Sequence, residues 1–380
     1  MPRLDWYATP AAQDAAATGC PALLVEPSAT NLVRNVSAML GQDYPPVSGG
    51  MTITTGSTDF TAPDGTSGTI NKYVGGAASG GTQYAYYSAG VTVTAAGQHT
   101  FSLFVKAGTT NPLNFVALQF IAFTGGSGTA TSYFSLASGT ALTAGASIQN
   151  YGNGWYRLIS APYTIASGDL AGNVQFTMAE ANNDITWPAS GALGLTAYTW
   201  GAQVEAGTVA TTYIPTTTAA VTRNADLVNA SGSTISGLIG QTEGTIYAEV
   251  DLRNWIASGR ILTCSNGTSN ERIMIQVGAN RTLQAIVTTA SADVANISTA
   301  SGQVNGVYKC ALTYASGDFA FYVNGTQIGT DSSGGVPACT SVFLGKIETS
   351  ASTNFLTDRI RAAALYTTRL SNDELAQLTT

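Results

Sequence analysis

The chain has 380 residues, of which 44% are hydrophobic and only 10% are charged, with a formal net charge of -7. This composition provides enough apolar side chains for two or three folded domains and excludes a long disordered chain. The acidic balance and the lack of a basic run exclude a typical nucleic-acid partner, and no apolar stretch is long enough to span a membrane.

The first 30 residues differ from the rest of the chain because they contain Pro2, Pro10, Pro21 and Pro27 around an alanine-rich stretch. We interpret residues 1–30 as an N-terminal arm that lies on a surface or inserts between subunits. The start of the chain lacks a charged segment followed by an apolar one, so we expect no standard secretion signal.

Short strands dominate the segment after the arm. Apolar and polar residues alternate over residues 91–94, 100–106 and 155–159, and clusters of Gly, Ser, Asn and Thr separate these runs. Alternation with one buried face, repeated at short intervals, is typical of a β-sandwich. The pattern predicts one sandwich over residues 31–223.

The second half continues in the same style. Residues 245–252 and 272–277 read as strands, and residues 319–328 read as a hairpin that turns on Asn324-Gly325. Ser371 and Glu374 have the spacing of a capping box, which predicts a short C-terminal helix. The Thr- and Ala-rich residues 216–220 suit a junction, so a second sandwich is expected over residues 224–380 and the fold class is all-β.

Three stretches of the first 225 residues resemble modular phage virion proteins. They are Pro2–Trp6 with Cys20–Leu32, then Asn153–Leu158, and then Tyr198–Gly207 with Tyr213–Thr217 and Val221–Arg223. The resemblance implies a jelly-roll sandwich similar to carbohydrate-binding modules. The C-terminal part resembles the concanavalin A-like (laminin-G-like) sandwich through Gly306–Tyr314, Phe321–Gly325, Asp358–Ile360 and Leu370–Leu375.

The resemblance implies a virion structural protein, namely a tail fibre, a head fibre or a capsid decoration, assembled in the host cytoplasm. The implied partners are other virion proteins through the arm and host-surface glycans, with a homotrimer as the expected assembly. Relatives usually carry a longer region upstream of the Pro2–Asp5 segment, so an anchoring domain is expected to be absent or to come from another chain. The alternatives are a glycan hydrolase, a purely structural decoration protein without a ligand, and a bacterial surface adhesin.

Catalysis finds little support in the sequence. Some enzymes with the concanavalin-like fold carry three alternating acids on one strand, which supplies the two carboxylates that glycosidic cleavage needs. Here Glu249 and Asp251 supply two of them, but Arg253 occupies the third position. We therefore predict no enzymatic activity and interpret this strand face as solvent-exposed.

Other reactive groups are isolated. His99 is the single histidine, so a Ser or Cys triad lacks a base, and we expect an exposed loop residue. Residues 125–128 are glycine-rich but lack the lysine of a phosphate loop, and they read as a hairpin tip.

The four cysteines form no metal-binding motif. They are Cys20, Cys264, Cys310 and Cys339, and a chain made in a reducing cytosol is expected to keep them as free thiols, with Cys310 buried in a strand. No cofactor is expected. Calcium is conceivable by analogy with both fold types, but no dense run of acids supports it.

Aromatic side chains are the best candidates for ligand binding, because sugar rings pack on aromatic faces. Trp187 follows the polar residues Asn182, Asn183 and Asp184, which predicts a glycan platform in which the three polar side chains read hydroxyl groups. The alternative is that Trp187 covers the end of the core. We interpret Trp155 and Trp200 as core residues and leave the role of Trp255 open.

Overall fold

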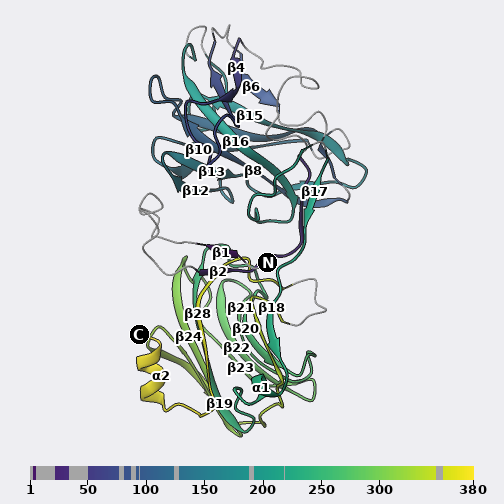
Figure 1. Ribbon diagram of the computed structural model, residues 1–380, viewed down its shortest axis with the longest axis vertical. Helices are drawn as coiled ribbons and strands as arrows, with labels where there is room; N and C mark the ends of the chain where they lie inside the picture. Colours follow the sequence, from purple (N-terminus) through teal and green to yellow (C-terminus); the bar gives the residue numbers. More distant parts are fainter. Residues whose placement is uncertain are drawn as a thin grey trace. The chain divides into compact units, whose positions relative to one another are not determined.

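A computed structural model describes residues 3–5, 22–33, 50–76, 81–86, 91–93, 95–123, 128–187, 192–217, 219–347 and 354–380. Its contacts divide the chain into two compact units (Figure 1). Of the described residues, those between 29 and 223 form the middle unit, and residues 3–5, residues 22–28 and those from 224 onward form the C-terminal unit. Antiparallel sheets form both units, so the predicted all-β fold class is confirmed.

The middle unit is a sandwich of two antiparallel sheets. Its seven-stranded sheet contains β4 (Thr52–Ser57), β5 (Ile70–Val74), β8 (Gly97–Ala107), β12 (Ser147–Gly152), β13 (Trp155–Ile159), β14 (Tyr163–Ile165) and β16 (Thr196–Ala206). Its six-stranded sheet contains β6 (Gln83–Tyr86), β7 (Val91–Thr92), β9 (Phe115–Phe123), β10 (Gly128–Ser135), β11 (Thr140–Ala141) and β15 (Ala171–Ala179). Alternate apolar side chains of both sheets, such as Leu103 and Leu118, fill the core between them.

A buried asparagine fastens the start of the middle unit to its end. β3 (Ala29–Asn31) pairs with β17 (Val221–Arg223), so the two ends of the unit form a short ribbon. The Asn31 Nδ2 donates to the carbonyl oxygens of Ala202 and Ile214 at 3.1 and 2.9 Å. Because Asn31 is fully buried, these bonds are shielded from water and favour one arrangement of the chain.

The segment after β16 is held by the polar residues of the phage-like motif. The Glu205 carboxylate accepts hydrogen bonds from the Thr211 amide and hydroxyl, and the Gln203 Oε1 accepts from the Ile214 amide at 2.6 Å. Both side chains are buried, and burial raises the pKa of Glu205. Gln203 and Glu205 of the motif therefore hold residues 211–214 against the sheet.

The C-terminal unit is a second sandwich. Its seven-stranded sheet contains β1 (Arg3–Asp5), β2 (Ala22–Leu24), β19 (Glu243–Leu252), β24 (Gly306–Ala315), β25 (Asp318–Val323), β26 (Thr326–Asp331) and β28 (Arg359–Tyr366). Its six-stranded sheet contains β18 (Val228–Ser231), β20 (Arg260–Ser265), β21 (Arg272–Gly278), β22 (Thr282–Thr289), β23 (Ala292–Ser298) and β27 (Ser341–Leu344). The apolar faces of β19 and β21 meet in the core between the sheets.

Residues 3–5 and 22–28 of the N-terminal arm belong to this second sandwich, whereas the arm's last two residues begin β3 of the middle unit. β2 pairs antiparallel with β28, where Leu23 stands opposite Ile360, and β1 pairs with β2. Val25 is fully buried, and a Cβ atom built on Gly345 would lie 2.5 Å from its Cβ. The apolar residues of the arm thus complete a sheet edge, while residues 6–21 lie outside the described residues. The anchoring or oligomerising role of residues 1–30 stays a prediction.

Two local predictions in the C-terminal unit are confirmed. Asn324 and Gly325 have φ values of 48° and 76°, which suits the tight turn between β25 and β26. The helix α2 (Asn372–Leu378) begins with the expected capping box, in which the Ser371 hydroxyl accepts from the Glu374 amide at 3.3 Å. A shorter helix, α1 (Ser233–Ser236), follows β18.

Three of the four cysteines are free and buried, as predicted. They are Cys264, Cys310 and Cys339, and Cys310 lies in β24. Burial raises the pKa of each of these thiols, which reaches about 12 for Cys339. Buried thiols that stay protonated are poor nucleophiles. Cys20 lies outside the described residues.

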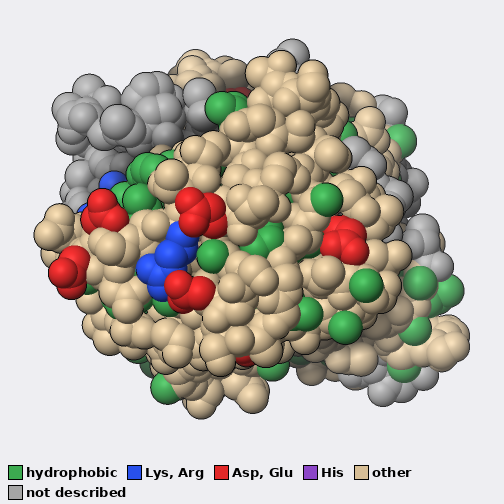
Figure 2. All heavy atoms as spheres, turned by 90° about the horizontal axis from the view of Figure 1, so that it is seen from below, with side chains coloured by type: hydrophobic (Ala, Val, Ile, Leu, Met, Phe, Trp, Pro, Cys, Tyr) green, Lys and Arg blue, Asp and Glu red, His purple; other side chains and the backbone are tan. Residues whose placement is uncertain are grey.

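The surface is sparsely charged. Figure 2 shows a face on which uncharged polar groups predominate, with hydrophobic and charged side chains scattered among them. No helix within the described ranges is long and apolar enough to cross a membrane.

Candidate ligand-binding site

The candidate site lies on the outer face of the seven-stranded sheet of the middle unit. Side chains alternate between the two faces of a strand, so Ala197 contributes to the core while Tyr198 lies on the outer face. Tyr198 stands opposite Lys72 of β5 and opposite Lys106 of β8. The register therefore creates a row in which an aromatic ring lies between two ammonium groups.

The connection between β4 and β5 lies across this row. The indole nitrogen of Trp155 donates to the Thr61 carbonyl oxygen at 3.0 Å and holds the connection against the sheet. Next to Thr61, the Phe60 ring packs edge-to-face on Tyr198, with a centroid distance of 4.8 Å and an interplanar angle of 88°. The Lys106 Nζ lies 4.3 Å from the Phe60 centroid, which is a favourable cation–π distance.

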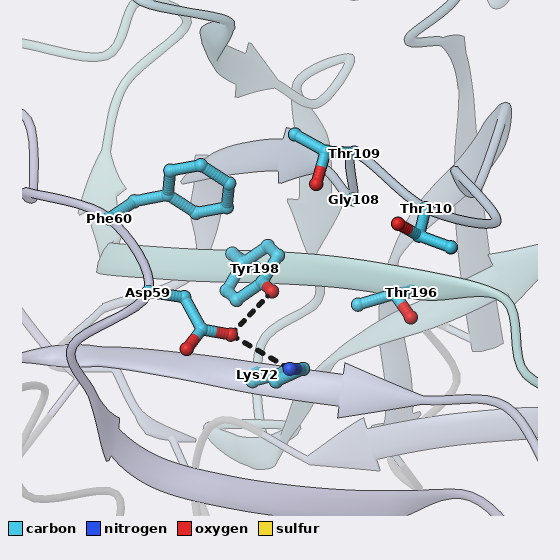
Figure 3. A pocket seen from close by; sticks show the side chains of 8 residues that line it. All are labelled: Asp59, Phe60, Lys72, Gly108, Thr109, Thr110, Thr196 and Tyr198. Atoms are coloured by element: carbon cyan, nitrogen blue, oxygen red, sulfur yellow. Dashed lines mark hydrogen bonds and ion pairs between the residues drawn. The ribbon is translucent and has the colours of Figure 1, made fainter.

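Asp59 is the central polar group of the site. Its Oδ2 accepts hydrogen bonds from the Lys72 ammonium and from the Tyr198 hydroxyl, both at 2.7 Å (Figure 3). The hydrogen bond from Lys72, followed by that from Tyr198, holds the pKa of Asp59 below its ordinary value. The carboxylate is therefore a charged hydrogen-bond acceptor at neutral pH, not a proton donor.

These groups border an open cavity of about 390 Å³. The eight residues that line it are Asp59, Phe60, Lys72, Gly108, Thr109, Thr110, Thr196 and Tyr198 (Figure 3). The lining combines a carboxylate, an ammonium group, three threonine hydroxyls and the rings of a phenylalanine and a tyrosine. Such a mixture suits a small polyhydroxylated ligand, whose hydroxyls need both donors and acceptors and whose C–H groups pack on a ring. Glycosidic cleavage needs two carboxyl groups, and this lining holds one.

The predicted platform around Trp187 is not formed in the way that the sequence suggested. Trp187 is only 5% exposed and belongs to the core of the middle unit, where its indole nitrogen donates to the Met178 carbonyl oxygen at 3.0 Å. A buried ring offers no face to a sugar, so the alternative interpretation of Trp187 as a core residue fits its position. Asn182, Asn183 and Asp184 lie exposed on a turn before it, and their role in ligand binding stays a prediction.

The strand face that bears Glu249 and Asp251 is less exposed than expected. Asp251 is 4% exposed and bonds Arg253, with 2.6 Å between its Oδ1 and the arginine Nε. The Glu249 Oε1 lies 3.2 Å from the Arg361 Nε. Further along the same face, α2 packs its Leu375 in a cluster with Tyr247 of β19. Each of the two carboxylates therefore already has an arginine partner.

Two further expectations concern His99 and the tryptophans. His99 was expected in an exposed loop, but it lies in β8 with 3% exposure, and burial lowers its pKa. Strand β8 begins at Gly97, so it includes His99, which was expected to lie in the turn before the strand. Trp155 and Trp200 are buried as predicted, although they pack in the outer-face cluster and not between the sheets. Trp255 is buried in the core of the C-terminal unit.

The residues that line the cavity were not predicted as a site from the sequence. Tyr198 belongs to the phage-like motif, but Asp59 lies 139 positions before it in the chain. The alternating pattern around Tyr198 and Lys106 was the available signal, since it places an aromatic and a cationic side chain on one face.

A metal site finds no support in the described ranges. No group of three or more His, Cys, Asp or Glu side chains lies close enough there to hold an ion.

Comparison with known proteins gives a family match for part of the chain. Residues 233–376 match the model of the concanavalin A-like lectin/glucanases superfamily, and no curated protein matches the chain. Among solved structures, Ruminococcus gnavus IT-sialidase CBM40 is 15% identical, with 40% of this chain and 98% of that chain covered and a TM-score of 0.34. A heptameric SAP-like pentraxin from Limulus polyphemus is 17% identical, with 36% and 70% covered and a TM-score of 0.29. At these TM-scores no function is carried over, and the concanavalin A-like match describes residues 233–376 alone.

Proposed function

We propose that this protein is a non-enzymatic structural protein of a phage virion, a fibre or a capsid decoration, that attaches to glycans on the host surface. The observation that carries the glycan-binding part is the open polar cavity around Asp59 and Tyr198, which presents acceptors, donors and a partly exposed ring together. The match of residues 233–376 to a superfamily of lectins and glucanases supports the same class of ligand.

The proposed setting is the virion, where many copies would act together. A single open polar site binds a sugar weakly, and several copies on one particle raise the avidity by about 10²–10⁴-fold. A sparsely charged surface offers little electrostatic protection against association, which supports a closed homo-oligomer, proposed here as a trimer. Other virion proteins are the proposed partners of the arm, residues 1–30.

Replacement of Phe60 by alanine tests the glycan site. Binding of the full-length protein to an array of bacterial surface glycans should weaken about tenfold, because a ring that packs on a sugar contributes about 1.4 kcal/mol. Tyr151→Ala is the matched control. The Tyr151 ring packs edge-to-face on Phe104 at 4.8 Å and 87°, on the same sheet, but it does not line the cavity.

If Phe60→Ala and Tyr151→Ala bind the glycans with equal affinity, the cavity is not the glycan site. If the wild-type protein binds no glycan on the array, the purely structural decoration role replaces the attachment role.

The proposal also predicts that the protein cleaves no glycan. Glu249 and Asp251 are each paired with an arginine, and Arg253 stands where a third acid would be needed. Incubation with a broad panel of polysaccharides should release no reducing ends above the level of a heat-treated sample. Activity that disappears in Glu249→Gln would establish the hydrolase alternative.

A further inference from the structure

The ion pair of Asp59 and Lys72 at the cavity of the middle unit keeps unused hydrogen-bonding capacity. The Lys72 Nζ lies 2.7 Å from the Asp59 Oδ2, and the side chains of Lys72 and Asp59 are 32% and 42% exposed. An ammonium group has three donors and a carboxylate has about four acceptor positions. The ion pair and the Tyr198 hydroxyl occupy only part of these positions. A ligand can therefore accept from Lys72 and donate to Asp59 without breaking the ion pair.

Tyr198 holds the carboxylate of this pair in place. The Tyr198 ring is 5% exposed, and Phe60 packs on it edge-to-face, so the direction of the tyrosine hydroxyl is fixed. Its hydrogen bond to the Asp59 Oδ2 fixes the carboxylate in turn. Lys72 stands opposite Tyr198 in the pairing of β5 with β16, and the hydrogen bond to Asp59 raises the pKa of Lys72. The acceptor and the donor are thus both ionised and ordered before a ligand arrives.

The rest of the cavity adds hydroxyl groups across from the ion pair. In Figure 3, Tyr198 lies between the side chains of Asp59 and Lys72 and those of Thr109 and Thr110. Thr109 and Thr110 are exposed and follow the end of β8. The ligand can therefore contact charged groups on one side and hydroxyl groups on the other.

The charges at the cavity favour a neutral ligand. Asp59 and Lys72 neutralise each other, so the pair attracts neither a carboxylate nor an ammonium group through a net charge. Lys106, the other ammonium group of the row, is not among the eight lining residues, and it donates to the Asn153 carbonyl oxygen.

We infer that the Asp59–Lys72 pair binds a vicinal diol of a neutral sugar, in which one hydroxyl donates to the Asp59 carboxylate and the adjacent hydroxyl accepts from the Lys72 ammonium. A diol fits because each hydroxyl both donates and accepts, and because adjacent hydroxyl oxygens are separated by roughly one hydrogen-bond length, as the two charged groups are. The Phe60 ring then packs on C–H groups of the sugar. The inference rests on the proposed function, since it names the chemical group that the same cavity recognises.

The test removes single hydroxyl groups from the ligand and single charged groups from the protein. The methyl glycosides of glucose, mannose, galactose and rhamnose are titrated into the full-length protein by ligand-observed nuclear magnetic resonance, followed by every monodeoxy analogue of the tightest binder. Loss of either of two adjacent hydroxyls should weaken binding about tenfold or more, because each bonds a charged group. Asp59→Ala and Lys72→Met should each weaken binding of the parent glycoside to a similar extent.

Combining the two kinds of change assigns each hydroxyl to its partner. A deoxy analogue that lacks the hydroxyl bound by Asp59 should bind Asp59→Ala almost as well as the parent glycoside does, and the same holds for the other hydroxyl and Lys72→Met. Asp64→Ala is the matched control. Asp64 is an exposed acid of the same connection, where it accepts from the Thr66 amide and hydroxyl, but it does not line the cavity. This variant should bind like the wild type.

Several results would overturn the inference. Dependence on only one hydroxyl, additive losses in the combined changes, or no binding of any methyl glycoside would exclude a diol held by the ion pair. Tighter binding of the corresponding methyl uronate than of its neutral parent would overturn the preference for a neutral sugar. If Asp59→Ala and Lys72→Met bind glycans like the wild type while Phe60→Ala loses array binding, the cavity remains the glycan site and only the role of the ion pair is wrong.

Discussion

Asp358→Ala is expected to lower the free energy of unfolding of the C-terminal unit by about 3–5 kcal/mol. The Asp358 carboxylate is fully buried and accepts hydrogen bonds from the backbone amides of Arg253, Asn254 and Trp255 at 3.0 to 3.2 Å. It thus fixes the bend that follows β19, in which Trp255 has a φ of 51°. Alanine would leave three amide groups without acceptors.

Calorimetric unfolding of the full-length protein would measure this loss. Asp358→Asn keeps one acceptor oxygen and should be less damaging than alanine, although its NH2 group faces donors. Asp318→Ala is the control, because the Asp318 side chain is 53% exposed in its ion pair with Arg369, and such pairs contribute about 0–1 kcal/mol. Similar effects of Asp358→Ala and Asp318→Ala would contradict the structural role of Asp358.

Trp187→Ala is expected to lower the free energy of unfolding of the middle unit by about 3–5 kcal/mol, because it empties the volume of a large ring in a packed core. Trp187→Phe should cost less, since it keeps an aromatic ring and loses the hydrogen bond to the Met178 carbonyl oxygen. Thermal unfolding followed by near-ultraviolet circular dichroism would distinguish the variants. A stable Trp187→Ala variant that loses glycan binding would restore the platform interpretation and overturn the core assignment.

The fold class and several local features were determined by the sequence itself. Alternating residues, the Asn324-Gly325 turn and the Ser371–Glu374 capping box predicted the sandwiches, a hairpin and the C-terminal helix. Each of these signals acts over a few neighbouring residues, because backbone dihedral preferences and hydrogen bonds near one turn decide the outcome. The burial of Cys310 followed in the same way from its position in an alternating strand.

The tertiary structure decided which side chains are exposed and which meet. Trp187 lies in a polar sequence, yet the sheets of the middle unit enclose its ring. Asp59 and Tyr198 are 139 positions apart and meet because the connection between β4 and β5 lies across the outer face of β16. The arm completes a sheet edge of the C-terminal unit through β2 and β28, near opposite ends of the chain. Short-range patterns carry no information about such contacts, since these depend on which strands become neighbours in a sheet and on which loops cover its faces.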